Sequence, residues 1–223
     1  MAEPRALVFD YGGVLTTPLQ DSMSSWCEDD GIDLGEFRKA LATWFGPEYG
    51  GEAAVNPIHA LELGEMEVPD FERELAKHLQ TRNGLPVEPE GLIARMFAGF
   101  SLESGMFNAL RHARAAGITT GLLSNSWGLD YPRDEWDELF DVVVISGEIG
   151  MRKPEPGIYQ HLIDKLGLEP AECVFVDDIK GNIDAAVEAG IVGVHHVTPQ
   201  QTIDELEALF KIPLRGQIGR SQA

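Results

Sequence analysis

The chain has 223 residues, of which 43% are hydrophobic and 24% are charged, and this composition is typical of a globular protein. Its length allows one large core, or one core with a smaller appended domain. The formal net charge of −20 argues against a nucleic acid or an anionic membrane as partner, because both attract clustered Lys and Arg. An anionic substrate would therefore need a metal ion or cations close to its binding site.

The sequence favours a cytoplasmic location and leaves the oligomeric state open. No apolar run approaches the ~20 residues that span a membrane. The first residues lead directly into an expected strand, which leaves no room for a signal peptide. The two cysteines, Cys27 and Cys173, lie far apart and predict no disulfide framework.

The first strand is followed by a long helical region. An apolar run, Ala6–Phe9, predicts a buried strand, and helical patterning with no convincing strand then extends over residues 17–100. One crossover between parallel strands needs far fewer residues, so this region predicts a separate helical cap. We expect its helices at Gln20–Asp29, Leu34–Phe45, Pro57–Leu63, Val68–Gln80 and Pro89–Phe100.

From about residue 104, helices and strands alternate. A helix is expected over Ser104–Ala116, followed by strands at 118–123, 141–145, 173–176 and 191–197 and by helices near 155–166 and 182–189. This alternation predicts an α/β fold with a Rossmann-like, mainly parallel sheet covered by helices on both faces. We therefore assign residues 1–16 and 101–212 to an α/β core, 17–100 to an inserted helical cap and 213–223 to a flexible tail.

Polar residues follow the predicted strands at their carboxyl ends, which is the edge where parallel sheets bind ligands. Each of them alone is more typical of a turn, a helix cap or a solvated surface group. Their occurrence at one strand end after another predicts a single site. The residues are Asp10, Ser124 with Asn125, Lys153, Asp177 with Asp178, and Asn182.

The order of these residues resembles motifs one to four of the haloacid dehalogenase (HAD) superfamily, and the helical insertion resembles its C1-type cap. The resemblance covers the chain up to about residue 210. Segments 150–155 and 176–182 are most similar to a phosphatase subgroup that includes bacterial glucose-1-phosphate phosphatases and the N-terminal phosphatase domain of soluble epoxide hydrolase. The resemblance implies a Mg²⁺-dependent phosphomonoester hydrolase acting on a small phosphorylated metabolite, with a sugar phosphate as one option.

The resemblance also implies a role for each site residue. Asp10 would be the nucleophile that forms an aspartyl phosphate, and Mg²⁺ would be held by Asp10, the Gly12 carbonyl and Asp178. Asp177 would hold a metal-bound water. The remaining implied roles are phosphoryl binding by Ser124 and by backbone amides near Asn125, and charge compensation by Lys153. From their positions in the chain, we expect Asn182 to orient Asp178 or to cap its helix, and Trp127 to line the pocket.

Gly12 departs from the pattern of the superfamily. There, a second aspartate at this position protonates the leaving group and activates the hydrolytic water. Such positioned acid–base catalysis is worth ~10²–10⁴-fold, so glycine predicts a slow to moderate enzyme, with sugar 1-phosphates and acyl phosphates least affected. Tyr11 is a possible replacement for this acid, but we expect it to point away from Asp10 along the strand. Arg152 could add positive charge for the phosphate, but we expect it to be a solvated surface residue.

Other functions remain open at this point. A 2-haloacid dehalogenase also lacks the second aspartate but needs no metal, so paired acids at Asp177 and Asp178 would serve little purpose. A non-catalytic HAD-like protein would bind a phosphometabolite or a protein partner. A phosphoacceptor receiver domain should carry its paired acids after the first strand, and we set it aside. Cap candidates for substrate selection are Trp26, Trp44, Phe45, Glu48, Tyr49 and His59.

Overall fold

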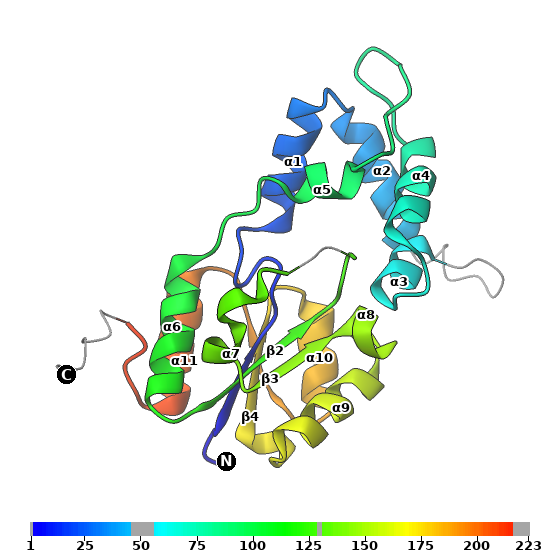
Figure 1. Ribbon diagram of the computed structural model, residues 1–223. Coiled ribbons are helices and arrows are strands. Elements are labelled where there is room, and N and C mark those ends of the chain that lie inside the picture. Colours follow the sequence, from blue (N-terminus) through cyan, green and yellow to red (C-terminus); the bar gives the residue numbers. More distant parts are fainter. Residues whose placement is uncertain (1, 46–55, 129–130, 216–223) are drawn as a thin grey trace.

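The computed structural model describes residues 2–45, 56–128 and 131–215, and it consists of a sheet-containing core with a helical cap above it (Figure 1). The core contains a five-stranded sheet in the order β3-β2-β1-β4-β5, and every pair of neighbours is parallel. This confirms the predicted α/β class. The strands are β1 Ala6–Phe9, β2 Thr119–Ser124, β3 Val142–Ile145, β4 Cys173–Asp177 and β5 Val192–His195.

The central strand β1 is buried on both faces, which explains its continuous apolar run. Side chains alternate along a strand, so Leu7 and Phe9 pack on one face and Ala6 and Val8 on the other. The first face is covered by α6 (Ser104–Ala115) and α11 (Pro199–Phe210), and the second by α9 (Pro156–Leu166) and α10 (Lys180–Glu188).

Three core helices were not predicted: α7 (Trp136–Leu139), α8 (Ser146–Ile149) and α11. The first two are single turns with little periodicity. The signal for α11 is present in the sequence, because Thr198 caps the helix by accepting from the Gln201 N–H and a proline follows it. In the described part of the chain, no helix is long and apolar enough to cross a bilayer.

The cap contains helices close to the predicted ones. Fifteen buried side chains, with Phe37 and Phe71 among the largest, form a cluster distinct from the two clusters of the sheet. On this ground we propose that residues 17–100 form a domain of their own. Three helices are shorter than predicted, α3 by a single residue, and the set is α1 Leu19–Asp29, α2 Leu34–Phe45, α3 Pro57–Glu62, α4 Val68–Lys77 and α5 Leu92–Phe97.

Hydrogen bonds join the cap to the core at the chain crossings and at the turn after α3. At the chain crossings, the Thr17 N–H donates to the Ser101 carbonyl over 2.8 Å. On the other side, the turn after α3 rests on α8, where Ser146 Oγ donates to the Glu62 carbonyl. Gly64 has φ +73°, and a Cβ there would lie 2.7 Å from the Gly147 carbonyl oxygen. This close approach requires glycine.

The packed chain extends into the segment that the sequence assigns to a tail. Leu214 is 1% exposed and belongs to the cluster between the sheet, α6 and α11. Its N–H donates to Glu207 Oε1 over 2.8 Å. The predicted boundary at residue 213 is therefore too early, and residues 216–223 lie outside the described part.

Replacing Leu214 by alanine tests this packing. We expect Leu214→Ala to lower the free energy of unfolding by about 2–4 kcal/mol, because it opens a cavity in the core. Arg215→Ala is the matched control, since Arg215 is exposed and pairs with Asp204 at the surface. Chemical denaturation should show a loss for the first variant alone. Equal denaturation midpoints for the two variants would mean that the chain from residue 213 onward does not pack on the core.

Candidate active site

The predicted site residues meet at the carboxyl edge of the sheet. Asp10 directly follows β1, Ser124 ends β2 and Asp177 ends β4, and β1 lies between the other two strands. Asp178 is the next residue after β4. Lys153 enters from the loop between α8 and α9. Strand order thus brings residues 143 positions apart into contact, as the sequence predicted.

Lys153 is the centre of this cluster. Its Nζ donates to Asp10 Oδ1 and to Asp177 Oδ2, each over 2.7 Å, and the residue is 1% exposed. Burial alone would lower the pKa of Lys153, but the Asp10 and Asp177 carboxylates outweigh it and raise that pKa above its ordinary value. The Phe175 ring lies 5.3 Å from the ammonium group. Lys153 is therefore a fixed positive charge beside Asp10.

Asn125 holds the backbone of Lys153 in place. Its Nδ2 donates to the Lys153 carbonyl over 3.0 Å, and its Oδ1 accepts from the Lys153 N–H over 2.9 Å. The side-chain amide is thus engaged with Lys153, and it also hydrogen-bonds the Glu62 carboxylate. This leaves the backbone of Asn125 as the better donor to a phosphoryl group. Ser124 Oγ lies 3.0 Å from the hydroxyl oxygen of Tyr131, a residue that no sequence pattern singled out.

Asp177 is fully buried, and both of its carboxylate oxygens are occupied. It accepts from Lys153 Nζ, from the Ile179 N–H over 2.8 Å, and from Asn182 Nδ2 over 3.1 and 3.0 Å. Asn182 therefore orients Asp177, and the prediction that it orients Asp178 is wrong. The reason is that α10 begins at Lys180, so Asn182 lies in its first turn and faces the buried strand end.

The three aspartates carry more negative charge than Lys153 balances. One carboxylate oxygen from each of Asp10, Asp177 and Asp178 lies within 4.8 Å of the others. Burial raises the pKa of Asp10 to about 7, and the neighbouring carboxylates add to the effect against the opposing charge of Lys153. Burial and Asp177 likewise raise the pKa of Asp178 to about 6.

These features fit a divalent cation. Carboxylate oxygens are the hard ligands that Mg²⁺ prefers. Within the described residues no side chain donates to the Asp178 carboxylate, whereas Asp177 is saturated. The carboxylates of Asp10 and Asp178 are therefore suited to be direct metal ligands. The Asp177 carboxylate is suited to the role expected for it, which is to hold a metal-bound water. A cation there would offset the excess negative charge.

The turn after β1 shapes the site. Gly13 has φ +77°, and a Cβ on it would come 2.4 Å from Asp178 Oδ2, so glycine lets this carboxylate lie against the turn. A Cβ on Gly12 would meet no atom within 4 Å. Gly12 thus leaves open space beside Asp10. Tyr11 lines the same cavity, contrary to prediction, because the chain turns after Phe9 and strand alternation no longer applies.

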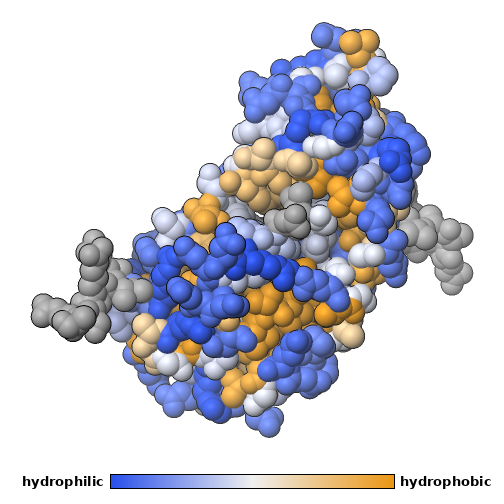
Figure 2. Space-filling view, viewed as in Figure 1, coloured by the Kyte–Doolittle hydropathy of each residue, from blue (hydrophilic) through white to orange (hydrophobic). Residues whose placement is uncertain are grey.

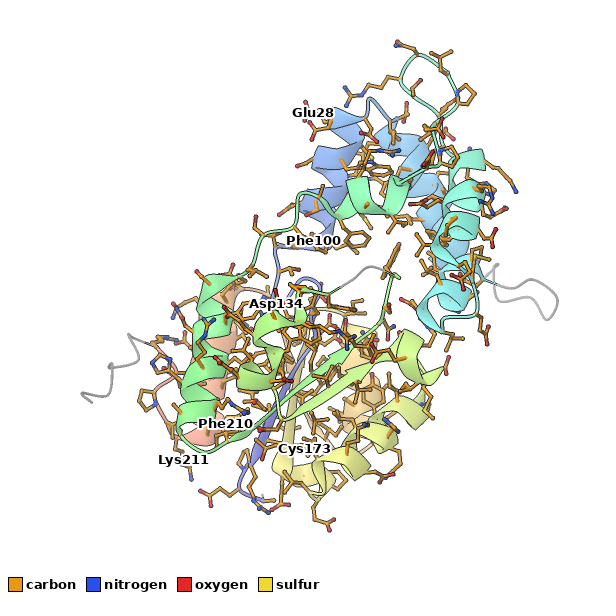
Figure 3. All side chains as sticks on the ribbon, in the orientation of Figure 1. Glu28, Phe100, Asp134, Cys173, Phe210 and Lys211 are labelled. Carbon is orange, nitrogen blue, oxygen red and sulfur yellow. The ribbon has the colours of Figure 1, made fainter. Side chains whose placement is uncertain are left out.

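A cavity of about 340 Å³ opens over Asp10 between the core and the cap. Trp127 lines it, as the sequence predicted, and its ring packs edge-on against Phe97 with centroids 5.6 Å apart. The labelled Phe100 lies on the side of the cap that faces the core (Figure 3). The lining residues are Asp10, Tyr11, Gly12, Leu19, Glu62, Phe97, Phe100, Ser124, Asn125, Trp127, Tyr131, Pro132, Lys153, Asp178, Ile179 and Asn182.

Arg152 is not the solvated surface residue that the sequence predicted. Its side chain is 11% exposed, and its Nε donates to Glu62 Oε2 over 2.6 Å. The cap covers it, which no local pattern shows. Burial raises the pKa of Glu62, and the Arg152 charge opposes this rise. Because Arg152 directly precedes Lys153, the Glu62–Arg152 ion pair links the cap to the loop that carries Lys153.

The cap residues proposed for substrate selection have different fates. Trp26 is buried in the cap, where its Nε1 donates to Asp30 Oδ2 over 2.9 Å, so it packs rather than binds. His59 is partly buried in α3 and does not line the cavity. Glu48, Tyr49 and the side chains of Trp44 and Phe45 lie outside the described part of the chain.

Removing one carboxylate should stabilise the metal-free protein. An acid whose pKa is raised in the folded state binds its proton more tightly there, so folding loses stability as pH rises through about 6 for Asp178. In EDTA at pH 8, we expect Asp178→Asn to be more stable than the wild type by roughly 1 kcal/mol after solvent screening.

This gain should shrink as pH falls from 6 toward 4, because the wild-type acid becomes protonated in the folded state first, and it should vanish once pH lies below the ordinary aspartate pKa of 3.8. Mg²⁺ should reverse the order by stabilising only the wild type. Thermal unfolding with EDTA and with Mg²⁺ at several pH values measures both effects. A wild type that is the more stable protein in EDTA at pH 8 would contradict the charge imbalance.

The family model for haloacid dehalogenase-like hydrolases matches residues 4–190. The sesquiterpene phosphatase AstK of Aspergillus oryzae is 30% identical over 92% of this chain and 96% of its own length. Mouse acyl-CoA dehydrogenase family member 10 is 29% identical over 94% of this chain, which spans 19% of that larger protein.

Solved structures share the fold. A predicted HAD-like hydrolase from Porphyromonas gingivalis superposes with a TM-score of 0.70 at 23% identity, covering 97% of this chain and 100% of that one. A HAD-family enzyme from Bacteroides thetaiotaomicron, in complex with magnesium and inorganic phosphate, has a TM-score of 0.58 at 20% identity. That match covers 87% of this chain and 94% of the other.

Proposed function

Since the chain belongs to the haloacid dehalogenase-like hydrolase family, we propose that it is a Mg²⁺-dependent phosphomonoester hydrolase with Asp10 as its nucleophile. The observation that carries this proposal is the buried ammonium of Lys153, which bonds to Asp10 within a cluster of three carboxylates below a cavity. Relatives named as phosphatases support the same reaction. The substrate would be a small phosphorylated metabolite.

The residues divide the chemistry between them. Ser124 Oγ lines the cavity beside Asp10 and is placed to donate to a phosphoryl oxygen. The Asp10 carboxylate attacks phosphorus, the bond to the ester oxygen breaks, and the departing alkoxide takes a proton from water. A water molecule then hydrolyses the aspartyl phosphate and restores Asp10. Lys153 balances part of the negative charge in both steps.

The raised pKa of Asp10 supports a role for a second cation. A nucleophilic carboxylate must be ionised, and a pKa of about 7 leaves much of it protonated near neutral pH. Mg²⁺ held by Asp10, Asp178 and the Gly12 carbonyl would supply positive charge that favours ionised Asp10 and offsets the phosphoryl oxygens. A B. thetaiotaomicron neighbour crystallised with magnesium and phosphate supports this choice of ion.

The alternatives account for less of the site. A 2-haloacid dehalogenase needs no metal and leaves the Asp178 carboxylate without a purpose. A non-catalytic binding protein has no need for a lysine that holds one Asp10 oxygen at 2.7 Å in a buried position. Gly12 remains the feature that favours either alternative, and it bears on the acid–base step rather than on the nucleophile.

Replacing the nucleophile tests the proposal. With Mg²⁺, we expect Asp10→Asn to lower phosphate release from acetyl phosphate and simple phosphate esters by about 10³-fold or more. Asp137→Asn, an exposed aspartate in α7, is the matched control and should keep full activity. Activity that survives in Asp10→Asn would contradict the proposal, and chloride release from 2-chloropropionate without Mg²⁺ would establish the dehalogenase instead.

Restoring the acid at position 12 tests what the glycine removes. There is room for a side chain, and φ of Gly12 is not positive, so Gly12→Asp is compatible with the turn. We expect about 10²-fold faster turnover of alkyl phosphates, and little change for acetyl phosphate with its better leaving group.

Gly12→Asn is the control for this change, because it has the same size and no acidic proton. Initial rates of phosphate release across the two substrate types measure the effect. An equal gain in the Asn variant, or no gain in the Asp variant while Mg²⁺ still stabilises it, would show that the proton comes from elsewhere.

A further inference from the structure

The cavity over Asp10 has two chemically different parts. Its floor carries the aspartates, Lys153 and Ser124. Its walls are apolar and come from both domains: from the cap and its return to the core, and from the loops after β2 and β4. Hydrophobic residues gather where the cap faces the core (Figure 2). The apolar wall residues are Leu19, Phe97, Phe100, Trp127, Pro132 and Ile179.

Three aromatic rings form a continuous part of this wall. Phe97 and Phe100 pack edge-on with centroids 4.8 Å apart, and Trp127 packs on Phe97 from the core side. Trp127 also packs against Phe71 in the cap interior. Because each ring is held by its neighbours, the wall is formed before a ligand arrives, which favours binding of an apolar group.

The polar groups in the lining are mostly engaged within the protein. The Glu62 carboxylate pairs with Arg152, and the Tyr131 hydroxyl with Ser124. Asn125 and Asn182 use their amides on Lys153 and Asp177.

Two further donors in the lining, the Tyr11 hydroxyl and the Trp127 indole N–H, have no hydrogen-bond partner within the described residues. They suffice for one or two polar atoms of a ligand. The four hydroxyls of a hexose phosphate would lose their hydrogen bonds to water on binding and would find too few partners in this cavity. Each hydroxyl that stays unpaired costs binding free energy.

We propose that the organic part of the substrate is apolar, namely an alkyl, prenyl or aryl group whose phosphate lies over Asp10. This inference rests on the proposed phosphatase function and specifies its substrate class. It favours an apolar ester over the sugar phosphate that the sequence left open. The space beside Gly12 lies on the same side as the cavity, so an apolar leaving group has room where other members of the superfamily carry an aspartate.

A chain-length series tests the inference. The probes are ethyl, butyl and hexyl phosphate and glucose 6-phosphate, with phosphate release measured in the presence of Mg²⁺. Each methylene removed from water favours binding by about fourfold, so we expect kcat/KM to rise at least tenfold from ethyl to hexyl phosphate. Glucose 6-phosphate should be no better than ethyl phosphate.

Binding is measured separately in Asp10→Asn with Mg²⁺ by calorimetry, where turnover plays no part. Hexyl phosphate should bind at least tenfold more tightly than glucose 6-phosphate. If ethyl and hexyl phosphate react or bind alike, or the sugar phosphate is preferred, the apolar assignment is wrong although the phosphatase stands. If no probe, acetyl phosphate included, releases phosphate, the proposed function itself fails, and tighter binding of hexyl phosphate would then support the apolar pocket alone.

Wall variants locate the effect. Phe100→Ser should reduce the preference for hexyl over ethyl phosphate by about fivefold or more, because it removes one aromatic ring from the wall. Leu85→Ser is the matched control, since Leu85 is 61% exposed on the cap and does not line the cavity. An unchanged preference in Phe100→Ser would overturn the place that we assign to the apolar group.

Discussion

Lys153 carries its positive charge into the protein interior, where an ammonium group persists only beside negative partners. Those partners are Asp10, which follows β1, and Asp177, which ends β4. A carboxylate oxygen of each lies 2.7 Å from Lys153 Nζ. The contact requires the strand order that places β4 beside β1, and it requires Asn125 to hold the Lys153 backbone. The geometry of the candidate site therefore depends directly on the strand order of the sheet.

The same cluster of carboxylates lowers the stability of the metal-free fold, and the proposed metal site accounts for this cost. Burial and mutual repulsion raise the pKa values of Asp10 and Asp178, so ionised carboxylates oppose folding in the absence of a metal. A divalent cation would convert this repulsion into binding energy. The cap forms one side of the cavity over Asp10, and the Glu62–Arg152 pair joins that cap to the loop that holds Lys153. A ligand that displaces water from this cavity would strengthen each of these charge interactions.

Much of this could be predicted from local patterns. Apolar runs locate the strands, and glycines mark where the helices between them end. Parallel topology then brings the carboxyl ends of the strands, with Asp10, Ser124 and Asp177, to one edge of the sheet. Contacts made only in three dimensions could not be predicted. Arg152 meets Glu62 across 90 residues, and the partner of Asn182 depends on where α10 begins. The orientation of Tyr11 depends on a turn that ends the strand alternation.

The most direct test of the account is whether phosphate becomes bonded to Asp10 during turnover. Acid quenching of a reaction with acetyl phosphate and Mg²⁺, followed by mass spectrometry of the peptide that contains Asp10, detects this intermediate. The account predicts a phosphoryl group on Asp10 that is absent in EDTA and is removed by further incubation. Phosphate release without a modified Asp10, or modification of another residue, would contradict it.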